Sequence, residues 1–269
     1  MDTPTVYLYD GSFEGLLCAV ARAVKSGRPV KGIYPERGFS PQLFDTVKHT
    51  ETDHQQASRL MDYLKNVTET AARFAINGFL SEDREVGLHL YRLVSECLAR
   101  GACATRLYSH DSVRYLERLS RRVEFEAHKF TGLLRFRIFA DGLQYAPFEP
   151  DCNVIGYCAA HFVTRLKNQQ WILHDTRRDQ ALYWNGAELK DVEIDADFTA
   201  HVRQHGEVAD SYLTREEHCY QGLWKSFHRV IANADRHNPG LQRQFMPRRY
   251  WKYLVEMQNC PAGVHHSRR

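Results

Sequence analysis

The sequence predicts an α+β protein, with a helical N-terminal half packed with a small antiparallel sheet and a C-terminal helical segment. β-rich runs flank an Asp-Gly turn at residues 141–142, and two further runs within 171–184 repeat the hairpin pattern. Apolar residues recur at helical spacing through most of 53–123. We expect a mainly helical region with an N-terminal strand over 1–127, and a hairpin–helix–hairpin with basic, aromatic helices over 128–269. We interpret these two regions as one integrated globular unit.

The N-terminal half opens with a strand at residues 6–9 and a helix at 13–25 that Ser12 caps. Glycine and proline residues punctuate 27–40, which is typical of a loop. A second strand is expected at 43–47. The helices predicted after it cover residues 53–65, 68–80, 84–100 and 109–123.

The first hairpin is expected to pair residues 130–139 with 143–148. Apolar residues on its first strand alternate with Arg135 and Arg137. Because successive side chains of a strand point to opposite faces, this alternation predicts one apolar face and one cationic face.

A helix capped by Asp151 or Asn153 is expected to connect the two hairpins. The second hairpin pairs residues 171–175 with 181–184, and a helix then begins near Thr214 with two glutamates in its first turn. This order of elements suggests an antiparallel sheet with a helix packed on one side.

Positive charge is concentrated near the C-terminus. From Arg215 onward ten lysines and arginines stand against four acidic residues, whereas the whole chain carries only +3. Concentrated positive charge is what a polyanion-binding surface needs. The candidate DNA-binding residues are Arg243, Arg248, Arg249, Lys252 and Trp251, together with Arg135 and Arg137 of the first hairpin.

The segment from His237 to Glu256 carries most of these candidates. Met246–Pro247 interrupts it, so the two arginines that follow would project from a helix N-terminus, which favours anions. An alternative stays open, in which the aromatic residues are the buried side of a closing helix and the arginines are solvated. A solvated helix face explains the four arginines within 114–122 as well as nucleic acid does.

Imidazole and carboxylate groups gather around the two hairpins, and this pairing is the one that general acid–base catalysis uses. The candidate catalytic residues are His174, Asp175, His161 and Glu149. The alternative is structural, because a histidine beside a strand often only bonds a neighbouring backbone group. Neither H-E-x-x-H nor the zinc-deaminase signature occurs, so we expect no metal and no cofactor.

The composition is that of a globular protein, with 43% hydrophobic and 26% charged residues. No apolar run approaches the roughly 20 residues that cross a bilayer, and the N-terminus lacks the pattern of a secretory signal. Seven cysteines without a C-x-x-C pair argue against a disulfide framework. We therefore expect a cytoplasmic protein whose thiols are small buried groups, with a disordered tail around His265–His266.

Several segments together resemble a known family. They are Tyr7–Gly15, His128–Phe136, Tyr145–Asp151, His161–Arg165, Trp171–Asp175 and Asn238–Tyr253. Over nearly its whole length the chain is similar to a bacterial family labelled "probable DNA metabolism protein". Members of that family are typically encoded beside a radical-SAM protein, and some carry a fused uracil-DNA-glycosylase-like domain.

The resemblance implies a DNA-binding protein that assists DNA repair or base modification as the partner of a radical-SAM enzyme. It identifies no catalytic residues, and the sequence does not decide whether the protein is an enzyme. One alternative is a nucleic-acid hydrolase, either a nuclease or glycosylase-like, that uses the candidate catalytic residues. The other is a protein-interaction scaffold with the aromatic C-terminal stretch as its interface.

Overall fold

The computed structural model describes residues 4–232 and 238–258. The chain divides into two compact units, Met1–Phe125 and Glu126–Arg269. Helices and two small sheets make up the α+β fold that the sequence predicts. His237 and the tail at His265–His266 lie outside the described residues.

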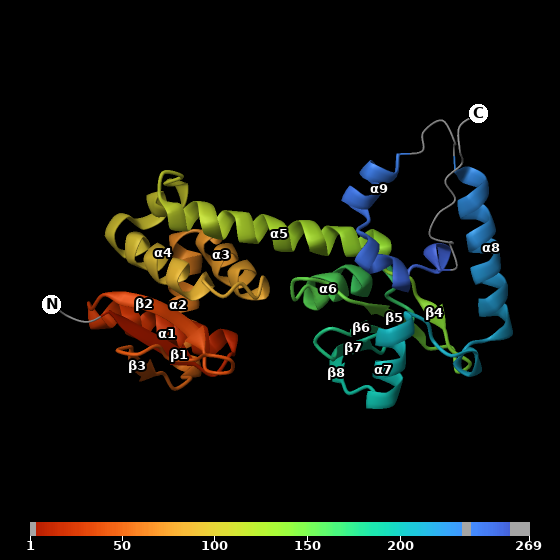
Figure 1. Ribbon diagram of the computed structural model, residues 1–269, viewed down its shortest axis with the longest axis horizontal. Coiled ribbons are helices and arrows are strands. Elements are labelled where there is room, and N and C mark those ends of the chain that lie inside the picture. The colour runs from red at the N-terminus through yellow and green to blue at the C-terminus, as the bar shows by residue number, and fades with distance from the viewer. Residues whose placement is uncertain (1–3, 233–237, 259–269) are drawn as a thin grey trace. The chain divides into compact units, whose positions relative to one another are not determined.

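The first unit is built on a three-stranded parallel sheet, red and orange in Figure 1. The strand order is β2-β1-β3, with β1 at Thr5–Tyr9, β2 at Val30–Pro35 and β3 at Thr46–His49. All five residues of β1 are buried, as expected of a central strand in a parallel sheet. The helices are α1 (Phe13–Ser26), α2 (His54–Val67), α3 (Glu69–Leu80), α4 (Val86–Arg100), the 3-10 turn η1 (Gly101–Arg106) and the first part of α5 (Asp111–Leu133).

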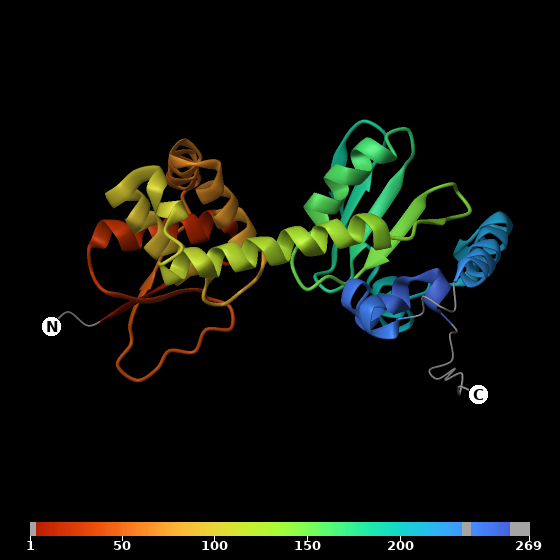
Figure 2. The same ribbon diagram turned by 90° about the horizontal axis from the view of Figure 1, so that it is seen from above.

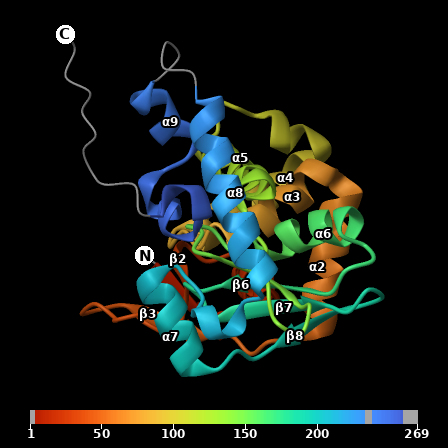
Figure 3. The same cartoon turned by 90° about the vertical axis from the view of Figure 1, so that its right-hand side faces the viewer.

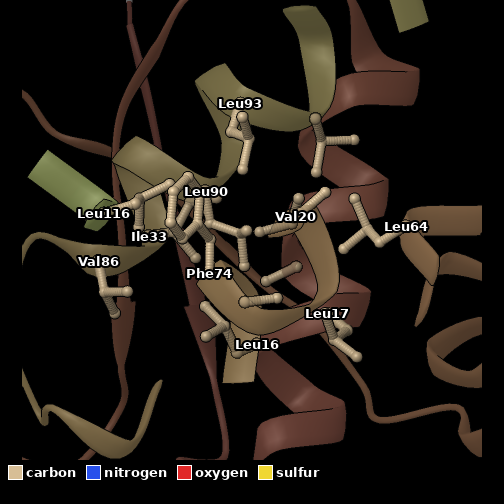
Figure 4. Packing of buried hydrophobic residues seen from close by; sticks show 14 of the residues in the cluster. Leu16, Leu17, Val20, Ile33, Leu64, Phe74, Val86, Leu90, Leu93 and Leu116 are labelled. Carbon is tan, nitrogen blue, oxygen red and sulfur yellow. The ribbon is translucent and has the colours of Figure 1, made fainter. Parts of the chain in front are cut away.

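Local sequence and one apolar core explain how this unit forms. Ser12 caps α1 as predicted, because its side chain accepts a hydrogen bond from the Gly15 N–H. The inward faces of α1, α3 and α4 meet over the sheet, where Leu16, Phe74 and Leu90 are almost fully buried (Figure 4). The helical spacing of such residues is the signal that predicted the helices of this unit.

Two predictions in the first unit are wrong. Residues 27–40 are not all loop, because β2 lies among them and pairs with β1. The strand expected at 43–47 instead spans Thr46–His49, and Leu43 and Phe44 are exposed. Both β2 and β3 pair with β1, and this pairing between distant segments decides where the two strands form.

The second unit contains a five-stranded sheet with the order β4-β5-β6-β7-β8. Its strands are β4 (Arg137–Ile138), β5 (Gln144–Phe148), β6 (Trp171–Asp175), β7 (Gln180–Trp184) and β8 (Leu189–Val192). The second predicted hairpin is confirmed, the first is confirmed only where Arg137–Ile138 pairs with β5, and β8 is an additional strand. The prediction of a wholly antiparallel sheet is wrong at β5 and β6, which are parallel because helix α6 (Ile155–Arg165) carries the chain back between them.

The strand predicted at 130–139 is mostly helix. Helix α5 continues unbroken to Leu133 (Figure 2), which leaves only two residues in β4. The reason is visible in the apolar spacing, because Val123, Ala127, Phe130 and Leu134 are all buried and continue a helical period. The Asp-Gly turn after β4 is present, with Gly142 at a φ of 87°.

The remaining elements of this unit follow the sheet. They are α7 (Ala196–His205), the 3-10 turn η2 (Asp210–Tyr212), α8 (Arg215–Ile231), α9 (Pro239–Phe245) and the 3-10 turns η4 (Arg248–Tyr253) and η5 (Val255–Met257). Thr214 caps α8, as predicted for that helix start. Helix α6 begins after Val154 without a side-chain cap, so the caps expected from Asp151 or Asn153 are wrong.

Different helices cover the two faces of the five-stranded sheet. Trp171 of β6 packs against Phe162 of α6. Tyr145 of β5 packs against Phe198 of α7, and its neighbour across the parallel pair is Ile172. Because side chains alternate along a strand, α6 and α7 cover opposite faces of the sheet (Figure 3).

Candidate functional site

The two arginines of the first hairpin do not form a cationic face. The Arg135 guanidinium is bound by the Glu256 carboxylate, with Nη2 at 2.6 Å from Oε1 and Nε at 3.3 Å from Oε2. Arg137 is only 2% exposed, and its Nη2 donates to the carbonyl oxygen of Gly206 at 2.7 Å. The expectation that this strand presents positive charge to solvent is therefore wrong, because one cation is neutralised and the other is buried.

Two cations of the C-terminal segment are also held by carboxylates. Arg249 Nη2 lies 2.5 Å from Asp151 Oδ2. The Lys252 ammonium group donates to the Glu149 carboxylate and to the carbonyl oxygen of Arg203. These internal partners offset the charge that a phosphate backbone would otherwise meet.

Arg243 and Arg248 remain exposed, and neither forms an ion pair with a carboxylate in the described part of the chain. The Arg248 guanidinium lies over the Trp251 ring, 5.6 Å from its centroid. Trp251 is half-buried and its Nε1 donates to the carbonyl oxygen of Met246 at 2.8 Å. Pro247 precedes η4, a short 3-10 turn, in place of the α-helix whose N-terminus was expected there.

The four candidate catalytic residues each have other partners in the fold. His174 and Asp175 are neighbours on β6, so their side chains point to opposite faces of the sheet. His161 lies on α6, where its ring packs against Phe162, and Glu149 follows β5. Within the part of the chain that the structure describes, no hydrogen bond joins any two of these four side chains.

Burial shifts the pKa values of both His174 and Asp175. His174 is fully buried, its Nδ1 lies 2.6 Å from the Tyr145 hydroxyl, and burial lowers the pKa of its imidazole. Burial also raises the pKa of Asp175 above its ordinary value, despite a hydrogen bond of 2.7 Å from Arg178 Nη1. Each group is used inside the fold, His174 beside Tyr145 and Asp175 beside Arg178.

A buried carboxylate, which the sequence did not reveal, holds the loop after β5. Glu126 is 5% exposed and accepts hydrogen bonds from the N–H groups of Asp151 and Cys152, each at 2.8 Å. The hydroxyl of Tyr250 donates to it as well, at 2.6 Å. Burial alone would raise the pKa of Glu126, but these donors hold it below its ordinary value.

A groove of about 360 Å³ lies along α8 in the second unit. Its walls combine aromatic rings with polar side chains, and they include Arg135, Phe136, Glu217, Tyr220, Gln221 and Trp224. A volume of roughly 300–1,000 Å³ is typical of small-molecule sites. None of the groove residues on α8 was a candidate from the sequence.

Glu256 fixes the geometry of one groove wall. It binds the Arg135 guanidinium and also accepts a hydrogen bond of 3.0 Å from Trp224 Nε1. The guanidinium in turn lies 5.5 Å from the centroid of the Trp224 ring. Arg135 and Trp224 are thus held in place before any ligand arrives.

Helix α8 leaves much of its apolar side exposed. Tyr220 is 61% exposed and Phe227 is 53% exposed, and Leu223, Val230 and Ile231 are exposed as well. These residues recur at spacings of three and four, so they share one side of the helix. That spacing predicts an amphipathic helix, and the structure adds that its apolar side is exposed.

The structure adds two observations on other classes of site. Among residues 4–232 and 238–258 no three His, Cys, Asp or Glu side chains gather where they could hold a metal ion. None of the described helices combines the length and apolar character that crossing a bilayer needs. Burial raises the pKa of Cys97 to about 11 and that of Cys158 to about 12, so both remain protonated thiols inside the fold.

The sequence model of a family described as a domain of unknown function, DUF4130, matches residues 84–256. The chain belongs to this family. The matched residues of the DUF4130 family include every residue that lines the groove along α8. A comparison with curated proteins gave no match.

Proposed function

We propose that the protein binds nucleic acid that has unpaired bases, through the groove along α8. The observation that carries this proposal is the set of aromatic rings at the groove, because Phe136, Tyr220 and Trp224 line one cavity. Aromatic side chains stack on unpaired bases and contribute roughly 1–3 kcal/mol for each base. This proposal moves the contact from the basic C-terminal segment to α8, because two of the four candidate cations of that segment, Arg249 and Lys252, are paired internally.

The wider role follows from the resemblance. A protein that binds unpaired bases fits an assistant in DNA repair or base modification, because such chemistry takes a base out of the stack. No hydrogen bond joins His161, His174, Asp175 and Glu149 to one another among the described residues, which favours binding over hydrolysis by this chain.

The test uses a fluorescent single-stranded DNA oligonucleotide and measures the change in anisotropy on binding. Tyr220→Ala removes an exposed ring that makes no hydrogen bond to the described residues, so folding should be unaffected. We expect the dissociation constant to rise at least about fivefold. Tyr157→Ala, an exposed aromatic on α6, is the matched control and should bind as the unchanged protein does. Equal affinity of all three proteins would remove the groove from the proposal.

A partner is the second part of the proposal. The resemblance suggests a radical-SAM protein, and exposed apolar residues such as Leu223 and Phe227 on α8 offer it a contact surface. Co-purification of the two proteins should succeed with the unchanged chain and fail with Leu223→Lys/Phe227→Lys. Retention of the complex by the double variant would place the contact elsewhere.

A further inference from the structure

Glu217 places its carboxylate at the groove along α8, and one of its two oxygens accepts no hydrogen bond from the described residues. The residue is 5% exposed and lines the groove along α8. Its Oε1 accepts a hydrogen bond from Gln221 Nε2 at 2.8 Å. Its Oε2 has no hydrogen-bond donor among the residues that the structure describes. Solvent reaches that oxygen, so a ligand in the groove can donate a hydrogen bond to it.

The ordinary structural roles of such a glutamate are not filled here. Thr214 and Glu217 have the spacing of a capping box, in which the glutamate would accept from the N–H of Thr214. That N–H instead donates to the carbonyl oxygen of Ile138 at 3.4 Å, and the Glu217 side chain is turned to Gln221. No described Lys, Arg or His forms an ion pair with Glu217 either.

We infer that the groove selects a guanine base, read through the carboxylate of Glu217. This inference rests on the proposed function and names the base that the same groove takes. Guanine carries two adjacent N–H donors on its Watson–Crick edge, which is free only when the base is unpaired. A carboxylate has two oxygens with about four acceptor positions, so it can accept both donors even with one position taken by Gln221.

The other bases fit this acceptor less well. Adenine and cytosine place one amino group beside a ring nitrogen that is itself an acceptor, and thymine places its one N–H between two carbonyl oxygens. Each would bring an acceptor against the carboxylate. Tyr220 and Trp224 contact the face of any base, so they supply affinity without choosing among bases.

The test varies one chemical group on the ligand. Single-stranded oligonucleotides of dT with a central dG, dI or dT differ only at the test base, and inosine lacks the 2-amino group of guanine. With the full chain, we expect the dG oligonucleotide to bind roughly tenfold more tightly than the dI oligonucleotide, because one hydrogen bond to a charged acceptor is lost. Glu217→Gln should reduce that ratio below about threefold. Glu216→Gln, an exposed neighbour on α8, should preserve the ratio.

The outcomes separate the two proposals. Equal binding of the dG, dI and dT oligonucleotides overturns the assignment of guanine and leaves base stacking in the groove intact. Failure of all three oligonucleotides to bind overturns both proposals. If Glu217→Gln does not fold, the ratio of dG to dI affinity in the unchanged protein decides alone.

Discussion

At the scale of single residues, one carboxylate organises the loop after β5. Glu126 binds two consecutive backbone N–H groups and the Tyr250 hydroxyl, so it joins α5, the loop and η4 within the second unit. Arg178 complements it, because its Nη atoms donate to the carbonyl oxygens of Pro150 and Asp151. N–H and C=O groups of the same loop are therefore satisfied by side chains, as buried backbone requires.

Glu126→Gln should destabilise the second unit by on the order of 2 kcal/mol. The amide keeps only one oxygen, so one buried N–H would meet an NH₂ group and lose its acceptor. Urea unfolding followed by tryptophan fluorescence measures the change. Glu188 is exposed and lies in the turn between β7 and β8, so Glu188→Gln should unfold as the unchanged protein does. An unfolding midpoint identical in both variants would contradict this role of Glu126.

Glu256 predicts how stability depends on pH. Burial acts to raise its pKa, but hydrogen bonds from Arg135, its own backbone N–H and Trp224 hold the pKa below the ordinary 4.5. A carboxylate whose pKa is lower in the folded state contributes stability above its unfolded pKa, and that contribution is lost as the pH falls through its folded pKa.

Glu256→Gln should therefore cost on the order of 3 kcal/mol at pH 7, because it leaves the Arg135 cation without its partner. The difference from the unchanged protein should shrink progressively below about pH 4.5. Urea unfolding at a series of pH values measures it, with Glu193→Gln as an exposed control. A difference that stays constant down to pH 3 would show that Glu256 does not act through its charge.

At the scale of elements, the contact between α7 and η4 depends on a glycine. Gly206 ends α7 with a φ of 70°, and a Cβ atom there would lie 2.1 Å from the carbonyl oxygen of Lys252. Gly142 in the β4–β5 turn also has positive φ, at 87°, but a Cβ atom there would meet nothing within 4 Å. The two positions share the backbone requirement and differ in the space around them.

Gly142→Ala should cost roughly 1–2 kcal/mol, which is the penalty of left-handed backbone for a residue with a Cβ atom. Gly206→Ala should cost clearly more, at least about 3 kcal/mol, because the backbone of η4 must also move. Thermal unfolding of the two variants side by side tests the comparison. Equal losses would mean that η4 adjusts freely around α7.

Elements with a local signal could be predicted from the sequence, and those that depend on distant partners could not. The helical spacing of α1 to α4, the caps of α1 to α3 and the turn residues of both hairpins lie in the sequence itself. Strand β2 and the parallel pairing of β5 with β6 depend on which strands the fold brings together. The start of the predicted first hairpin is helix, because the apolar period of α5 continues through Phe130.

The candidate site shows the same division. The arginines were recognised by residue type, but their partners Glu256, Glu149 and Asp151 are brought to them by folding. Counting the lysines and arginines of the sequence therefore overestimates the positive charge that the folded surface presents, because internal ion pairs neutralise part of it. The aromatic residues of α8 have a helical spacing that the sequence shows, whereas net charge points to the segment after α8.

At the scale of the whole molecule, the tryptophans report on one unit only. The chain has four, and Trp171, Trp184, Trp224 and Trp251 all lie within Glu126–Arg269. Leu90 is fully buried in the core of the first unit. Tryptophan fluorescence therefore follows the unfolding of the second unit, and a substitution such as one at Leu90 changes the first unit only.

Leu90→Ala should destabilise the first unit by roughly 2–5 kcal/mol through the cavity that it leaves. Because each unit has its own core, we expect the transition seen by far-ultraviolet circular dichroism to move while the tryptophan transition stays in place. A shift of the same size in both signals would show that the chain unfolds as one integrated unit.

The internal pairing of Arg135, Arg249 and Lys252 has a kinetic consequence. Long-range attraction accelerates encounter only when charge is left uncompensated, and of the four candidate cations in the C-terminal segment Arg243 and Arg248 have no carboxylate partner among the described residues. An oligonucleotide should then associate at an unsteered rate, about 10⁵–10⁶ M⁻¹s⁻¹, with an affinity that falls with salt on a shallow slope near −1.4. Stopped-flow mixing over a range of ionic strength would measure both. Long-range electrostatic attraction would then contribute little to the rate at which the protein and an oligonucleotide associate.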